Sequence, residues 1–411
     1  MTQPEKLIQQ PSRLSRNFYL LLTGNVVSVF GSSIYLLVII LHLKETTGSA
    51  TLLGFYNFLA LLPPVLLGPF AGALVDRWSR KHVIIFTDVI RGVLMLMLAG
   101  LALSPAGIQV FPLLVVTGIA GITQAFFLPA VQAIIPDLEP PHLLKRANSA
   151  RAAGSQLSNL AGNALGGLVF SVFGLVPVLF ANGVSFLLSA LQESWIVITD
   201  QTRNMVRISI LKETQEGFRY LMRRRGLRTL VLLNSMVFFL TPPLVLVLPF
   251  LVEDTLGLGT PMVGVFFSAL LAGGISAYLL WGLIPISTTG DYRIFTTSFF
   301  LLSAVVLMIG LFLTPVVLFI GLFFAGASIG SIHLMINVVV QRSVSPSRRA
   351  RIFSLIEASG GLTAPFAYLA SGILIDLLLQ ELVLMFLGTS LVIALAGGIG
   401  LKSRNLRRLI R

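Results

Sequence analysis

Twelve apolar runs, each about twenty residues long, divide this chain of 411 residues. An α-helix rises about 1.5 Å per residue, so a run of about 20 residues crosses the hydrocarbon core of a bilayer. Lipid offers backbone groups no partner, and runs without strict alternation exclude a closed barrel. We therefore predict an all-α membrane protein with twelve transmembrane helices, centred near Ser28, Leu62, Leu94, Ile119, Leu160, Ser185, Phe239, Leu271, Leu302, Ala327, Ala364 and Ile393.

The composition excludes several function classes. Charged residues make up 11% of the chain, against about 25% in a soluble domain. The net charge of +13 is spread over short loops rather than a folded basic domain, so we expect contact with anionic lipid headgroups and not with nucleic acid. The chain has no cysteine, its four histidines lack metal-ligand spacing, and no phosphate-binding loop motif occurs. We expect no enzyme, no cofactor and no metal.

The placement of basic residues predicts the topology. Of the 29 lysines and arginines, all except Lys44 and Arg91 lie in the tails or in every second gap between apolar runs. Short cytoplasmic loops carry this excess of positive charge. We therefore expect both termini in the cytoplasm, Lys44 outside, and Arg91 within the third helix near its cytoplasmic end. The expected location is the inner membrane of a bacterium.

A polar stretch divides the apolar runs six and six. We predict an N-terminal bundle over residues 1–198, a cytoplasmic linker over 199–228 and a C-terminal bundle over 229–411. The linker alternates apolar and charged residues as an amphipathic surface helix does, and Arg223, Arg224 and Arg225 follow it, ready to pair with phosphates. A solvated helix without a specific partner is the simpler alternative.

The two halves resemble diverged copies of one unit. A shift of 205 positions aligns Gln132 with Asn337 and Gly167 with Gly372, and maps the fourth and fifth helices onto the tenth and eleventh. Many secondary transporters are built from such repeats, with the substrate site between the halves near mid-membrane. The duplication therefore predicts two pseudo-symmetric six-helix bundles in one chain, and we expect a monomer.

The loop after the second predicted helix carries a specific motif. Its residues, Gly72-Ala73-Leu74-Val75-Asp76-Arg77-Trp78-Ser79-Arg80-Lys81, resemble the signature G-x-L-x-D-R-x-G-R-K of the major facilitator superfamily, with Ser79 in place of the second glycine. In that family the loop latches the two halves on the cytoplasmic side. The resemblance implies a cytoplasmic gate of Gly72, Asp76, Arg77, Arg80, Lys81, Asp88 and Arg91. A plain positively charged loop would explain Arg80 and Lys81 alone.

Other stretches resemble the drug, macrolide and siderophore exporters of that family. The fifth helix is similar to the antiporter motif G-x-x-x-G-P-x-x-G-G, although Asn163 replaces its proline and Ser158 its first glycine. Residues 135–138, 216–221 and 349–355 also match this branch. The resemblance implies proton-coupled efflux of an amphipathic small molecule by alternating access. A lipid or lysophospholipid flippase of the same fold is an alternative, and a non-transporting receptor or scaffold is a remote one.

Polar side chains inside the helices are the candidate substrate ligands, because facing lipid would be costly. Those of the first helix recur at steps of three and four, which places them on one face. The candidate cavity residues are Asn25, Ser28, Ser32, Tyr35, Gln124, Gln156, Asn159, Asn163, Asn234, His333 and Asn337. The expected aromatic lining is Phe126, Phe127, Phe238 and Phe239. Each polar stripe is equally explained as hydrogen bonding between helices.

One carboxylate lies well inside a helix of the second half. Glu357 falls about seven residues into the eleventh helix, and His333 lies at a similar depth in the tenth. A charged, unpaired carboxylate at this depth costs about 3 kcal/mol, so it should bind a proton or a partner. Glu357 with His333 is therefore the candidate for proton coupling. A structural ion pair near the interface is the alternative.

Overall fold

The computed structural model describes residues 13–75, 77–105, 107–198, 210–284, 288–378 and 381–410, and the described residues contain helices and no strand. The first half consists of α1 (Arg16–Thr47), α2 (Ala50–Val75), α3 (Arg80–Ala102), α4 (Val110–Leu138), a 3-10 turn (Pro141–Leu143), α5 (Leu144–Phe173) and α6 (Leu175–Ser194). The linker helix is α7 (Ile210–Arg223). The second half consists of α8 (Arg225–Leu240), α9 (Pro242–Leu246), a π-helix (Phe250–Thr255), α10 (Pro261–Leu283), α11 (Thr288–Leu311), α12 (Pro315–Ser343), α13 (Pro346–Leu377), α14 (Leu382–Lys402) and α15 (Arg404–Ile410).

The all-α membrane fold is confirmed. Eleven helical spans among the described residues are long and apolar enough to cross a membrane. The remaining predicted span is α5, which has 30 residues but carries Arg151, Gln156 and Asn159 within its length. It packs between α1 and α10, so two sides of this helix face protein rather than lipid.

Local chemistry fixes where the spanning helices start and stop. The Ser15 hydroxyl accepts the Phe18 N–H at 3.1 Å and caps the start of α1. Gly48, with φ of 62°, ends the same helix in the left-handed conformation that glycine adopts freely. The seventh predicted run is one span broken into α8, α9 and the π-helix, because Pro242 and Pro243 cannot continue the hydrogen bonding of α8.

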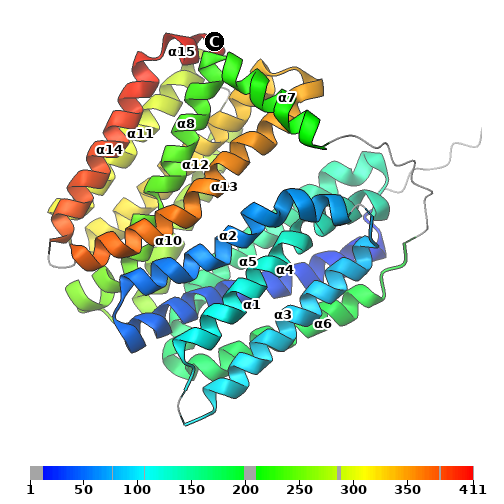
Figure 1. The fold of residues 1–411 in the computed structure, drawn as a ribbon. Helices are drawn as coiled ribbons and strands as arrows, with labels where there is room; N and C mark the ends of the chain where they lie inside the picture. The colour runs from blue at the N-terminus through cyan, green and yellow to red at the C-terminus, as the bar shows by residue number, and fades with distance from the viewer. Residues whose placement is uncertain are drawn as a thin grey trace, which may run out of the picture.

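The helices form two groups that meet on one side of the molecule (Figure 1). Within the first group α3 packs on α6, α1 on α5 and α2 on α4; within the second, α10 packs on α12 and α11 on α14. The two groups touch mainly through α2 against α13 and α5 against α10. We call the helix ends near α7 the linker side, and the opposite ends, where α1 turns into α2, the far side.

Charged groups join the halves on the far side. Lys44, at the end of α1, lies 2.7 Å from a Glu253 carboxylate oxygen and 2.6 Å from one of Asp254. Asp376, at the end of α13, accepts the Ala50 N–H at 2.8 Å and the Thr51 N–H at 2.9 Å. A carboxylate at a helix N-terminus is stabilised by the unpaired N–H groups and by the helix dipole. Both contacts hold the far side closed.

The packing around glycines differs between the far side and the linker side. A Cβ atom added at Gly54 or Gly372 would lie within 3 Å of the facing helix backbone, where α2 and α13 cross near the far side. Gly167 of α5 is equally close to the start of α10. Gly68 and Gly72, on the linker side of α2, have nothing within 4 Å of such an atom. The halves are therefore packed on the far side and apart on the linker side.

Candidate substrate cavity and gates

A cavity of about 420 Å³, lined by both polar and apolar side chains, lies among α1, α3, α4, α5 and α6 of the first half. The predicted residues that the structure brings together around it are Asn25, Ser28, Ser32, Gln124 and Asn159, with Phe127 from the predicted aromatic lining. The α1 residues share one face because they recur at steps of three and four, as the sequence indicated.

Two arginines also line this cavity, and neither is among the cavity residues predicted from the sequence. Arg91 reaches it from α3 and Arg151 from α5. Arg151, Ser155 and Asn159 are four residues apart and lie on the same face of α5. The four-residue spacing from Arg151 to Ser155 and Asn159 is the sequence signal that identifies Arg151 as a cavity residue.

Several cavity groups bind one another across α1 and α5. The Ser155 hydroxyl donates to Asn25 Oδ1 at 3.2 Å, and the Ser33 hydroxyl donates to Asn159 Oδ1 at 2.6 Å. These amides therefore join helices as well as facing the cavity. Among the described residues, the buried Ser28 hydroxyl and the Arg151 Nε atom have no hydrogen-bond partner. Leaving a buried donor unpaired costs about 1–3 kcal/mol, so both groups favour a ligand or water in the cavity.

Three other predicted cavity residues of the first half do not line this cavity. The Tyr35 hydroxyl lies 3.4 Å from that of Tyr56 on α2 and joins two helices. Asn163 donates within its own helix to the Asn159 carbonyl at 2.8 Å. The Gln156 side chain is exposed.

The predicted residues of the second half lie elsewhere. Asn234 is buried and donates to the Ile356 carbonyl at 3.1 Å, which joins α8 to α13. The His333 ring lies 5.3 Å from that of Phe238, and its Nε2 atom is buried without a hydrogen bond in the described structure. Asn337 is partly buried on α12.

Two of the predicted aromatic residues face away from the cavity. Phe126 stacks on Trp78 at 6.3 Å and lines an apolar groove of about 950 Å³ on the outer surface of α3 and α4. The Phe239 side chain is 45% exposed.

Glu357 has an exposed side chain on α13 and interacts electrostatically with Tyr278 of α10. No hydrogen bond or ion pair links Glu357 to His333 within the described residues. The proposed pair is therefore not formed in this conformation.

A charged cluster of Asp88, Arg91 and Glu193 lies beside the cavity. Asp88 of α3 and Glu193 of α6 are 0% and 1% exposed, and they interact electrostatically. The Arg91 Nη1 atom lies 3.7 Å from Asp88 Oδ1, and Arg91 Nε donates to Thr123 at 3.1 Å. Both Asp88 oxygens and Glu193 Oε2 have no hydrogen-bond partner in the described chain. Two carboxylates thus share one guanidinium, which also lines the cavity.

Two of the predicted gate residues contact other elements of the first half. Arg80 lies 3.0 Å from Asp137 of α4, and Lys81 donates to the Ser194 carbonyl at 2.6 Å. Arg77 is exposed. Asp76 lies outside the described residues. A Cβ atom added at Gly72 would have nothing within 4 Å in this conformation, in which the halves are apart on the linker side.

The profile of the family described as Major Facilitator Superfamily matches residues 21–313, more than half of the chain. The chain belongs to the Major Facilitator Superfamily. This superfamily member is a multi-pass membrane protein and a transporter, not an enzyme.

Curated relatives are similar over most of its length. It is 27% identical to macrolide efflux protein A of Streptococcus pyogenes over 380 residues, covering 87% of this chain and 89% of the relative. It is 30% identical to the putative bacilysin exporter BacE of Bacillus subtilis (strain 168) over 349 residues, covering 80% and 83%. These similarities confirm the resemblance to the drug and macrolide exporter branch.

Solved structures of the superfamily share the fold. The nucleoside transporter NupG superposes with a TM-score of 0.76 at 14% identity, covering 95% of this transporter and 100% of that chain. A bacterial homolog of the human lysosomal transporter Spinster gives a TM-score of 0.63 at 16% identity, covering 96% and 97%. At this identity the likeness concerns the fold alone.

Proposed function

We propose that this transporter exports an amphipathic small molecule by alternating access and that inward proton movement drives the export. The observation that carries the proposal is a cavity with polar and apolar lining in a protein whose halves are closed on the far side and apart on the linker side. The basic residues favour a cytoplasmic linker side and cytoplasmic termini. In that orientation the cavity belongs to a state able to load substrate from the cytoplasm.

The cavity chemistry favours a substrate with hydrogen-bond acceptors on an apolar body. Arg91 and Arg151 supply guanidinium donors, and Asn25 and Gln124 supply amides. Phe127 and Phe186 add aromatic surface. Drugs, macrolides and siderophores combine such features, and the names of the relatives, which mention macrolide and bacilysin, support this class.

Proton coupling rests on the buried cluster and on Glu357. With both carboxyls ionised, Asp88, Glu193 and Arg91 carry a net charge of −1 in an interior where an unpaired charge is expensive. A proton on one carboxyl balances that charge. Arg91 lines the cavity, so a substrate acceptor that binds Arg91 weakens its hold on Asp88. This arrangement links substrate binding to protonation in the first half, while Glu357 is the candidate acid of the second half.

The test is transport by proteoliposomes under an imposed pH gradient. A radiolabelled macrolide, bacilysin and a siderophore would be compared as substrates. Asp88→Asn, Glu193→Gln and Glu357→Gln would each be measured beside Glu381→Gln, a matched change at an exposed position of the far side. We expect loss of gradient-driven transport in at least one of the first three variants, with substrate counterflow retained. Gradient-driven transport equal to the parent in all three would refute proton coupling through these acids.

Lipid transport is the second candidate. Its support is the apolar groove on α3 and α4, where Phe86 and Trp78 are 66% and 53% exposed. A lysophospholipid with a labelled headgroup, added to the same proteoliposomes, separates the two functions. Faster flipping of this lipid than uptake of any water-soluble probe would favour the flippase.

A further inference from the structure

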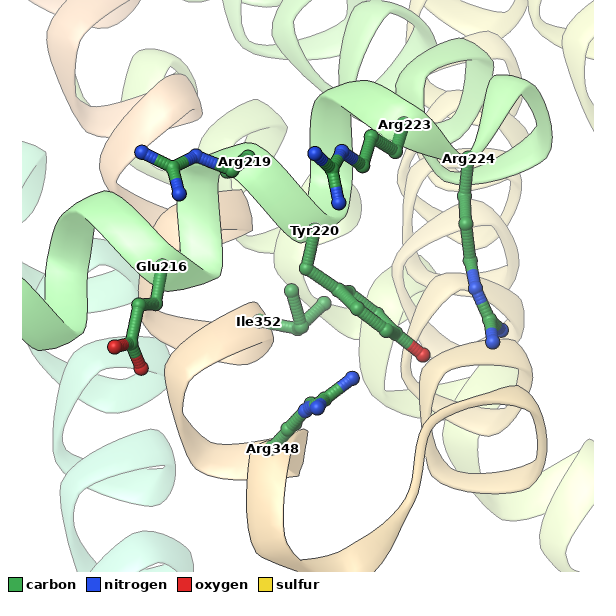
Figure 2. Close-up of a pocket in the computed structure, with 7 residues that line it drawn as sticks. All are labelled: Glu216, Arg219, Tyr220, Arg223, Arg224, Arg348 and Ile352. Atoms are coloured by element: carbon green, nitrogen blue, oxygen red, sulfur yellow. The ribbon is translucent and has the colours of Figure 1, made fainter.

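A second pocket lies on the linker side, away from the substrate cavity. It has a volume of about 520 Å³ and lies between the linker helix α7 and the start of α13. Figure 2 shows the residues that line it: Glu216, Arg219, Tyr220, Arg223, Arg224, Arg348 and Ile352. Four of these seven side chains are arginines, which come from two segments far apart in the sequence.

Tyr220 holds two of the arginines in place. The Arg224 guanidinium carbon lies 4.6 Å from the centre of the Tyr220 ring, and that of Arg348 lies 4.9 Å from it. Figure 2 shows Tyr220 between these two side chains. Arg224 also donates to the Ser343 carbonyl at 3.4 Å. The aromatic ring therefore brings together two cations that would otherwise repel each other.

The charge of the pocket is unbalanced. Four arginines and one acidic residue, Glu216, line it. In the parts of the chain that the structure describes, Arg219, Arg223 and Arg348 have no acidic partner. The excess of cations around a pocket of this size favours binding of an anion. A phosphate group suits them because guanidinium donors match its oxygens in pairs.

The surroundings indicate where the phosphate comes from. On α7, next to the pocket, the Phe218 side chain is 53% exposed and that of Met222 is 37% exposed. A helix with exposed apolar and basic groups at the end of a transmembrane bundle lies at the membrane interface. There the basic groups meet headgroups while the apolar ones meet acyl chains.

We propose that this pocket binds the phosphate group of an anionic phospholipid and thereby fastens the linker helix to α13. The site does not depend on which substrate the transporter exports. Inorganic phosphate could bind the same arginines, but it has no acyl chain to contact Phe218 and Met222.

The experiment measures lipid binding to delipidated, purified full-length protein by native mass spectrometry. The probes are cardiolipin, phosphatidylglycerol, phosphatidylcholine and inorganic phosphate. The pocket variant is Arg223→Gln with Arg348→Gln. The control is Arg404→Gln with Arg408→Gln, which removes the same charge from exposed positions of α15 on the same side. All affected side chains are exposed, and melting temperatures would show that each variant remains folded.

We expect the parent to bind cardiolipin or phosphatidylglycerol at least tenfold more tightly than phosphatidylcholine. The pocket variant should lose that preference, whereas the control should change by less than twofold. Equal losses in both variants would overturn the proposal in favour of diffuse surface charge. Binding of inorganic phosphate without preference for anionic lipid would overturn the lipid source. Absence of any anion binding to the parent would overturn the site itself.

Discussion

The ion pair on the far side should set the balance between the two access states. Lys44 is 8% exposed, and its partners Glu253 and Asp254 are 16% and 56% exposed. Breaking a buried pair costs about 3–5 kcal/mol, whereas an exposed pair contributes about 0–1 kcal/mol. This pair is intermediate: Lys44 binds Glu253 Oε2, and the buried Oε1 atom of Glu253 has no hydrogen-bond partner in the described structure. We therefore expect Lys44→Met to destabilise the closed far side by about 2 kcal/mol.

That cost applies to one state only, because opening the far side separates Lys44 from the second half. Since about 1.4 kcal/mol corresponds to a tenfold change, the ratio of states should shift roughly 30-fold toward far-side opening. The chain has no cysteine, so spin labels at Thr47→Cys and Thr255→Cys report the far-side distance directly by pulsed electron resonance.

Lys44→Arg should retain the short far-side distance because it keeps the charge, and Lys402→Met controls for the loss of a lysine on the linker side. An unchanged distance distribution in Lys44→Met would show that the ion pair does not hold the far side closed, and would refute this reasoning.

Three further predictions concern the cavity, the helix crossing and the orientation. Arg151→Gln should weaken binding of an acceptor-bearing substrate about 10- to 100-fold, because a hydrogen bond to a charged group contributes about 1.5–3 kcal/mol. Equilibrium binding of labelled substrate measures this change in affinity, and an unchanged affinity would exclude Arg151 from the site. Gly372→Leu should force α2 from α13 and lengthen the far-side distance, while Gly388→Leu, in open space on α14, should not. Impermeant maleimide on intact cells should label Thr47→Cys and not Thr214→Cys; the reverse pattern would invert the proposed orientation.

Much of the fold follows from the sequence because lipid restricts the choice. Each apolar run had to become a helix, so the twelve predicted centres all fall within helical spans. The interruption of the seventh span did not follow from length, although Pro242 and Pro243 mark the break. Helical periodicity predicts which side chains of a single helix share a face. It therefore correctly groups Asn25, Ser28 and Ser32, which line the cavity together.

Contacts between distant segments were not predictable in the same way. Glu193 looks like a loop residue in the sequence, since it lies one residue before the end of α6. Only the packing of α6 on α3 buries it beside Asp88. Lys44 looks like an isolated exception to the charge rule, and its partner Glu253 is 209 positions away. Periodicity identifies which side chains share a face, but not which face another helix covers.

The sequence does not show which side of the transporter is open, because α2 carries glycines toward both of its ends. Gly54 and Gly372 allow α2 and α13 to cross closely on the far side, whereas Gly72 lies on the same α2 with open space around it. A glycine that contacts nothing in one state still removes the obstacle to close packing in another. We therefore infer that closing the linker side brings the Gly72 end of α2 against the start of α13. That movement would carry the first half toward the α7 end of the second half while the Lys44 contacts on the far side break.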